Sequence, residues 1–349
     1  MLSRGPLLGL SLTAAAGALS AGAILVVVYM VARHVVLVRR TSGGAPQSEG
    51  KKRPIVKTHV DAYMISLLVS DLLQAVGAMI NVHHVRVGRT ECSVYCTAQG
   101  VLKSLGEPSA AMATLAITIH TFCVICFHWS PSQPQKLVPC LVISAIWLYV
   151  SLYVGIAYAL HHKPGHEFFQ PVPYWCWVAN GYPEERISAE YIWLWLSVFG
   201  AVVLYVPLWL VVRGNVEVSP WRFTWCPSRS THGAAFDRMR QSLKMLLYPA
   251  VYIILVLPLS VTRWIMFSGH DISSTWTFVG IVPFHLSGLG NVLLLLLTRP
   301  SILVFGKPQE RGTTKMQLSR MPEVFAISVH VEEGVYDETV GDKSKVLEE

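Results

Sequence analysis

The most informative pattern in this chain is a succession of long apolar stretches separated by shorter polar ones. A helix needs about 20 mostly apolar residues to cross the hydrocarbon layer of a membrane. In lipid, the backbone N–H and C=O groups of a spanning segment must be hydrogen-bonded within the protein, which favours helices and closed barrels. The stretches lack the short alternating runs of a barrel, so each is predicted to be a helix. Seven stretches qualify, at 7–32, 59–82, 97–126, 137–160, 191–212, 243–267 and 274–298.

The first stretch has an alternative interpretation as a secretory signal peptide, because Arg4 precedes an apolar run with small residues. The apolar run continues to Val31, well past the core of a signal peptide. We therefore expect a retained first helix. Cleavage would leave six spans and keep the other loops in place.

The composition excludes a water-soluble protein. Of the 349 residues, 52% are hydrophobic and only 14% are charged, with a mean hydropathy of +0.46. Soluble domains carry roughly 25% charged residues, and disordered chains are poor in apolar residues. Many of the 11 Trp and 13 Tyr, Trp175 and Trp177 among them, suit the aromatic belt at a membrane interface.

The basic residues predict the orientation. Of the 28 Lys and Arg, 21 lie on one side of the predicted membrane and six on the other. The positive-inside rule then places the N-terminus outside and the C-terminus in the cytoplasm. The net charge of +7 thus reflects topology and contact with anionic lipid, and no soluble basic module suggests a nucleic-acid partner.

Together these features predict an all-α integral membrane protein, a bundle of seven transmembrane helices in the plasma membrane. The bundle occupies residues 1–306. Residues 307–349 hold several Ser and Thr and more acidic than basic residues, and we expect a disordered cytoplasmic tail there.

Three of the seven cysteines, Cys92, Cys96 and Cys176, fall on the predicted outer side, where disulfides persist. We expect a bridge between Cys96 and Cys176 that holds the second outer loop over the bundle. Cys92 is the alternative to Cys96, which is favoured because it abuts the third helix. Free thiols are the remaining possibility.

Ionisable residues at membrane depth are costly and mark candidate functional positions. In the third stretch, Lys103 and Glu107 are one turn apart and can neutralise each other. They belong to a polar stripe at helical spacing that must face the bundle interior. The pair either fixes the position of the helix or anchors a ligand. The stripe comprises Gln99, Lys103, Glu107, Ala110, Thr114, Thr118 and Thr121.

Asp71 is the other intramembrane charge, near the middle of the second stretch. It could hydrogen-bond to Asn291 of the seventh stretch or bind a cation, and we favour the hydrogen bond, with a role in conformational switching. Pro258 is predicted to bend the sixth helix, either as part of a moving element or as static packing.

Several short segments carry a resemblance to a known family. They are Leu67-Leu-Val-Ser-Asp71, Cys96-Thr-Ala-Gln-Gly100, Ile117-Thr-Ile-His-Thr-Phe122, Tyr248-Pro-Ala-Val-Tyr252 with Leu257-Pro258, Gly290-Asn291 and Thr298-Arg-Pro300. With them, the chain resembles fungal G-protein-coupled receptors of the cAMP-receptor-like and glucose-sensing-receptor-like group.

This resemblance implies a receptor that detects an extracellular small molecule, such as a nutrient or a cAMP-like signal, and activates the Gα subunit of a heterotrimeric G protein. Candidate ligand contacts in the outer half are Gln99, Lys103, Glu107, Arg263 and His285. Candidate residues facing the G protein are Arg222, Arg238, Arg240 and Lys244, whose charge lipid contact would explain equally well.

The main alternative is a membrane transporter or channel without G-protein coupling, although the two halves show no repeat. A retinal protein is excluded because the seventh stretch has no lysine for a Schiff base. The lone histidines His120 and His285 do not form a metal-binding set. We therefore expect no enzyme activity, cofactor or metal.

Overall fold

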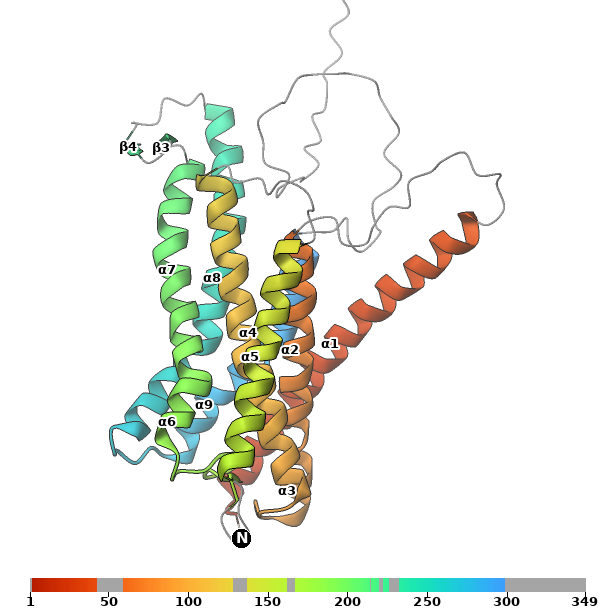
Figure 1. Ribbon diagram of the computed structural model, residues 1–349, viewed down its shortest axis with the longest axis vertical. Coiled ribbons are helices and arrows are strands. Elements are labelled where there is room, and N and C mark those ends of the chain that lie inside the picture. Colours follow the sequence, from red (N-terminus) through yellow and green to blue (C-terminus); the bar gives the residue numbers. More distant parts are fainter. Residues whose placement is uncertain are drawn as a thin grey trace, which may run out of the picture.

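The computed structural model describes residues 2–42, 59–127, 137–161, 167–213, 215–219, 222–225 and 232–298. Within residues 216–249 it describes backbone only. The described chain is an elongated bundle of helices with two small hairpins, one at each end (Figure 1).

The helices follow the predicted apolar stretches and usually extend beyond them. They are α1 (Arg4–Ser42), α2 (His59–Met79), α3 (Asn81–Val87), α4 (Val94–Cys126), α5 (Leu137–His161), α6 (Pro183–Arg186), the π-helix η1 (Ile187–Tyr191), α7 (Ile192–Arg213), α8 (His232–Phe267), α9 (Ser274–His285) and α10 (Ser287–Thr298).

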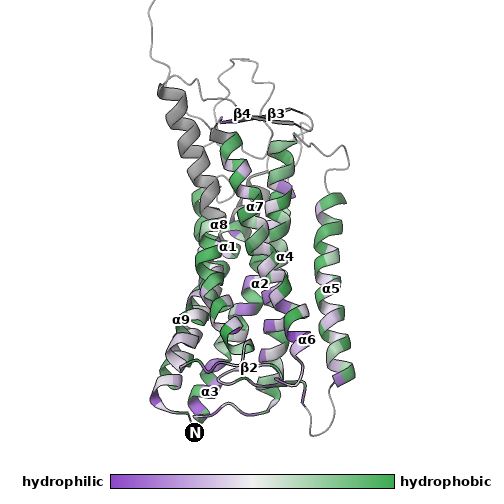
Figure 2. Ribbon diagram, turned by 90° about the vertical axis from the view of Figure 1, so that its left-hand side faces the viewer, coloured by the Kyte–Doolittle hydropathy of each residue, from purple (hydrophilic) through white to green (hydrophobic). Residues whose placement is uncertain are grey.

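Six helical segments of the described chain are long and apolar enough to span a membrane. They are Arg4–Arg33, His59–Val87, Leu137–His161, Pro183–Val211, Ala250–Phe267 and Ser274–Leu297. Large apolar side chains such as Leu148, Phe199 and Ile254 are more than half exposed on them, and hydrophobic residues run along their length in Figure 2. The fold is therefore that of an all-α, multi-pass membrane protein.

The predicted third span coincides with α4, which is not among these six segments. It is 33 residues long and packs against α2, α5 and α7 inside the bundle (Figure 1). Its first half carries Lys103 and Glu107, whereas residues 109–126 contain no Asp, Glu, Lys or Arg.

The contact between α2 and α4 is close enough to require glycine. A Cβ atom at Gly106 would lie 2.8 Å from the backbone nitrogen of Gln74 and 2.9 Å from the carbonyl oxygen of Ser70. The two helix backbones therefore touch at this point. This contact places Glu107, the next residue of α4, beside the polar residues of α2.

Two antiparallel hairpins close the ends of the bundle. Strands β1 (Phe169–Pro171) and β2 (Cys176–Val178) pair at the end where the N-terminus lies, with Gln170 opposite Trp177. Strands β3 (Val216–Ser219) and β4 (Arg222–Trp225) pair at the opposite end.

Two of the predicted continuous spans are interrupted and a third is extended. The stretch predicted at 59–82 divides into α2 and α3 at Ile80. The stretch predicted at 274–298 divides into α9 and α10 at Leu286, three residues after Pro283. The segment predicted to begin at residue 191 is preceded by α6 and η1, so that helical structure begins at Pro183. Proline and a π-helical turn are both recognised causes of irregular helix geometry.

Candidate functional site

The β1–β2 hairpin is fastened onto α4 at the N-terminal end of the bundle. As predicted, Cys176 forms a disulfide with Cys96, 80 residues earlier. The thiol of Cys92 is free and exposed. A Cβ atom at Gly100 would lie 2.3 Å from the Phe169 ring, so glycine at this position lets the hairpin rest directly on the helix.

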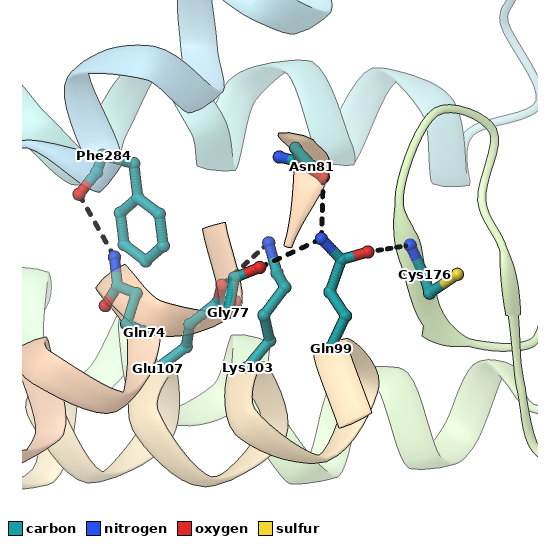
Figure 3. A network of polar contacts seen from close by, with 8 residues as sticks. All are labelled: Gln74, Gly77, Asn81, Gln99, Lys103, Glu107, Cys176 and Phe284. Atoms are coloured by element: carbon teal, nitrogen blue, oxygen red, sulfur yellow. Dashed lines mark hydrogen bonds and ion pairs between the residues drawn. The ribbon is translucent and has the colours of Figure 1, made fainter. Parts of the chain in front are cut away.

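Gln99 uses its whole amide group to hold this junction together (Figure 3). Its Nε2 donates to the Gly77 carbonyl oxygen at 3.0 Å and to Asn81 Oδ1 at 2.7 Å. Its Oε1 accepts from the Cys176 backbone N–H at 2.7 Å and lies 3.2 Å from His84 Nε2. With both donors and its acceptor engaged, Gln99 ties the hairpin to α2 and α3 and has no group left for a ligand in this structure.

Lys103 and Glu107 form the predicted ion pair, with 3.0 Å between Lys103 Nζ and Glu107 Oε1 (Figure 3). Both side chains are only 3% exposed. The Lys103 ammonium also lies 5.1 Å from the ring centre of Trp175, at the tip of the hairpin. The two charges therefore neutralise each other in part, and the Lys103 ammonium also faces Trp175 of the hairpin.

Two further charged groups reach the same place from other helices. Glu190 lies on the π-helical turn η1, is 2% exposed, and lines the same space as Glu107. Arg263 lies near the end of α8 and is 4% exposed. Its guanidinium carbon is 4.7 Å from the ring centre of Trp175 and 5.6 Å from that of Trp177.

Arg263 and Glu190 keep unused polar atoms in this interior. Arg263 Nε and Glu190 Oε2 make no hydrogen bond to any described residue. The only hydrogen bond recorded for the Arg263 side chain runs from Nη1 to the weak acceptor Met266 Sδ, at 3.8 Å. A buried polar group without a partner carries a substantial desolvation cost.

These charged residues and their aromatic and apolar neighbours enclose what we call the hairpin chamber. It is bounded by Lys103, Glu107, Trp175, Trp177, Glu190, Tyr191, Leu259, Arg263 and Ile281. The space not filled by atoms is about 190 Å³, yet it is nowhere wide enough for a water molecule. The chamber is thus closed in this structure, and any ligand would have to displace one of its walls.

A second polar region lies deeper in the bundle, around Asp71. One carboxylate oxygen accepts from Asn291 Nδ2 at 2.7 Å and the other from Ser287 Oγ at 2.9 Å. The predicted bond between Asp71 and Asn291 is therefore confirmed. Asp71 lines a small cavity of about 20 Å³, the Asp71 cavity, together with Leu67, Gln74, Glu107, Ala110, Ala111, Thr114, Leu194, Val251, Tyr252, Leu255, Val256, Phe284, Ser287 and Asn291.

The break between α9 and α10 faces this cavity, and neighbouring helices satisfy its backbone. Gln74 Nε2 donates to the Phe284 carbonyl oxygen at 3.2 Å. Ser20 Oγ donates to the His285 carbonyl oxygen at 2.7 Å and accepts from the Leu289 N–H at 3.3 Å. A broken helix is tolerated in a bundle when its neighbours supply such partners.

Glu107 borders both regions, since it lines the hairpin chamber and the Asp71 cavity. Below it the predicted polar stripe continues into the interior, where Thr118 and Thr121 are 3% and 6% exposed. The stripe thus faces the bundle, as its spacing predicted, and Glu107 is the residue through which the two regions touch.

The remaining predicted site residues fall in different places. His285, on α9, is 2% exposed with Nδ1 unpartnered among the described residues, but it does not line the hairpin chamber. Pro258 packs beside α9, where its carbonyl oxygen would lie 3.1 Å from a Cβ atom at Gly280. The side chains of Arg222, Arg238, Arg240 and Lys244, and the whole of residues 307–349, lie outside the described part of the chain.

Sequence reasoning missed six of the nine residues that bound the chamber: Trp175, Trp177, Glu190, Tyr191, Leu259 and Ile281. Trp175 and Trp177, predicted to lie in an interfacial belt, are instead only 1% and 2% exposed. Their position on either side of Cys176 was a usable signal, because the disulfide draws both neighbours toward α4. Glu190 falls immediately before the predicted span at 191–212, and only the helical extension through η1 brings it inside.

The hairpin chamber can bind and orient a small charged molecule, since it offers two cations, two carboxyl groups and aromatic faces. Within the described residues, no group of three or more His, Cys, Asp or Glu side chains is placed to hold a metal ion. The chain matches no protein-family model, and no curated protein shows significant similarity to it.

Proposed function

We propose that this protein is a G-protein-coupled receptor with seven transmembrane helices, whose hairpin chamber detects an extracellular small molecule. In this proposal α4 is the seventh span, the end of the bundle that carries β1 and β2 faces outward, and the β3–β4 end faces the cytoplasm. The charge distribution of the sequence supports this orientation, because 21 of the 28 Lys and Arg fall in segments predicted to be cytoplasmic.

The single observation that carries the proposal is the contact of two polar regions at Glu107. A receptor needs a site that a ligand can enter from the outside and an element with two arrangements, and a ligand acts by favouring one of them. In this proposal the hairpin chamber becomes that site when a ligand displaces part of its wall. The Asp71 cavity, beside a helix broken at Leu286 and held by hydrogen bonds to α1 and α2, supplies a candidate for the second requirement.

The proposed partner is a heterotrimeric G protein, engaged at the inner ends of α4, α7 and α8. Its choice rests on the resemblance to fungal receptors of the cAMP-receptor-like and glucose-sensing-receptor-like group. Arg222, Arg238, Arg240 and Lys244 occur in the segment that joins α7 to the membrane-spanning part of α8 and are the candidate contacts.

The test is nucleotide exchange on a purified fungal Gα subunit by the protein reconstituted in lipid nanodiscs. We expect the protein to accelerate exchange, and a variant with all four basic residues replaced by glutamine to lose the acceleration while it remains folded. No acceleration with any Gα subunit, together with flux of solutes across vesicles that contain the protein, would instead identify a transporter or channel.

A further inference from the structure

The hairpin chamber holds a guanidinium group whose charge is not matched by a close anion. Salt bridges within 4.0 Å, among the described residues, join Arg89 to Glu91, Lys103 to Glu107 and His161 to Glu185, and Arg263 takes part in none of them. Arg263 nevertheless is 4% exposed and keeps Nε without an acceptor. Buried charges in proteins are normally paired, so this arginine requires a partner that the described chain does not provide.

The charge balance of the chamber gives the sign of that partner. The carboxyl groups of Glu107 and Glu190 line the chamber, and so do the cationic groups of Lys103 and Arg263. These two anions and two cations balance each other. A third cation, Arg186, lies 5.0 Å from the ring centre of Trp177. The chamber therefore has an excess of positive charge.

The walls limit the size and the body of the partner. The chamber has no room even for a water molecule as it stands, so the space for a ligand must come from displacement of one side chain of its wall, and only a small ligand fits. Leu259, Ile281 and the two tryptophans supply apolar surface next to the charges. A small molecule with one anionic group and a short apolar or aromatic body matches these features.

The anion that suits Arg263 is a carboxylate. The guanidinium group forms paired hydrogen bonds with the two oxygens of a carboxylate or a phosphate. A carboxylate carries the single negative charge that the chamber lacks, whereas a phosphate monoester brings close to two charges beside the carboxylates already present. The Trp175 indole, which now lies over both Lys103 and Arg263, is the wall that must turn aside to admit it.

We propose that the hairpin chamber binds a small organic carboxylate, held by Arg263 and flanked by Lys103, with its apolar body against Trp177, Leu259 and Ile281. The description of this ligand as a signal rests on the proposed function. Its binding does not, because the site can be studied in the purified protein without a G protein.

The test measures thermal unfolding of the purified full-length chain in nanodiscs with paired probes of nearly equal shape. Propionate and benzoate are the carboxylates, propionamide and benzamide are their neutral counterparts, and phenyl phosphate is the phosphate probe. We expect saturable stabilisation by a carboxylate and at least about tenfold weaker binding of its amide and of phenyl phosphate. Equal binding of amide and carboxylate, stronger binding of the phosphate, or no response to either carboxylate would overturn the proposal.

Variants place the binding at Arg263. Arg263→Gln should unfold at a temperature close to that of the parent protein and bind the carboxylate about 10- to 100-fold more weakly. The matched control is Arg89→Gln, which removes an exposed arginine paired with Glu91 and should bind as the parent does. A carboxylate response that survives Arg263→Gln, or a large loss of stability in that variant without ligand, would show that Arg263 is structural and would refute the site.

The two proposals fail separately. Carboxylate binding without acceleration of nucleotide exchange on any Gα subunit would support the carboxylate site and refute the receptor function. Acceleration of exchange without carboxylate binding would support the receptor function and refute the carboxylate site.

Discussion

The hairpin chamber and the Asp71 cavity are both polar, both buried and both bordered by Glu107, yet they differ in how their polar atoms are satisfied. Asp71 accepts hydrogen bonds on both carboxylate oxygens. In the chamber, Arg263 Nε and Glu190 Oε2 have no partner among the described residues. A carboxylate with both oxygens engaged joins helices, whereas a buried guanidinium without a matching anion has binding capacity to spare.

The difference follows from where each region obtains its partners. Asp71, Ser287 and Asn291 come from α2 and α10, and their groups complement one another within a small volume. The chamber gathers charges from α4, η1 and α8, and the Trp175 indole of the hairpin covers them. Substitutions in the two regions should therefore have different costs, and the following predictions rank those costs.

The largest loss of stability is expected from breaking the buried ion pair on one side. Glu107→Leu leaves the Lys103 ammonium, 3% exposed, without its carboxylate, and uncompensated buried charges cost about 3–5 kcal/mol. The double variant Lys103→Met with Glu107→Leu should recover most of this loss, because both charges are gone. Detergent-titrated unfolding of the three proteins measures it, and a double variant no more stable than Glu107→Leu would contradict the prediction.

The next loss comes from the link that holds the hairpin over the chamber. Replacing Cys96 and Cys176 together with serine removes a disulfide that closes a loop of 80 residues, and such a change costs about 2–5 kcal/mol in small secreted domains. We expect a lower unfolding temperature and faster proteolysis between residues 167 and 182. Cys92→Ser removes an exposed, free thiol and serves as the control, which should behave as the parent.

A smaller loss is expected at the Asp71 cavity. Asp71→Ala leaves Asn291 and Ser287 without their acceptor, and an orphaned buried donor costs about 1–3 kcal/mol. Asp71→Asn should lose less, because its amide oxygen still accepts one of the two bonds. Unfolding measurements give the order, and basal exchange on a Gα subunit should change in the same order if α10 is part of the switch. An asparagine variant as unstable as the alanine variant would show that charge matters here more than hydrogen bonding.

The helices were largely predictable from the sequence because lipid imposes a simple rule of length and apolarity. Six helical segments of the described chain obey that rule, and α4 packs among its neighbours with Lys103 and Glu107 as a buried pair. The ion pair, the disulfide and the bond between Asp71 and Asn291 each followed from residues at helical spacing or on one side of the membrane.

The walls of the chamber were less predictable, for reasons that are three-dimensional. Gln99 had the spacing of a ligand contact, but the hairpin backbone and α2 occupy its amide group. Glu190 and Trp175 reach the chamber only because η1 extends α7 and because the disulfide turns the hairpin inward. Periodicity along one helix cannot reveal contacts made by a loop that folds back over it.

The smallest change in stability is expected at Arg263, although it is as deeply buried as the groups above. Arg263→Met removes a guanidinium whose burial is not offset by a close carboxylate, which favours the variant. It also removes the contacts with Trp175 and Trp177, which contribute about 0.5–2 kcal/mol for a desolvated cation over an aromatic ring. These effects oppose each other, so the unliganded variant should unfold within about 1 kcal/mol of the parent. The same measurement on Glu107→Leu supplies the contrast. If Arg263→Met lost as much stability as that variant, Arg263 would be a structural member of the bundle. The distinction between the hydrogen-bonded carboxylate of Asp71 and the unmatched guanidinium of Arg263 would then no longer hold.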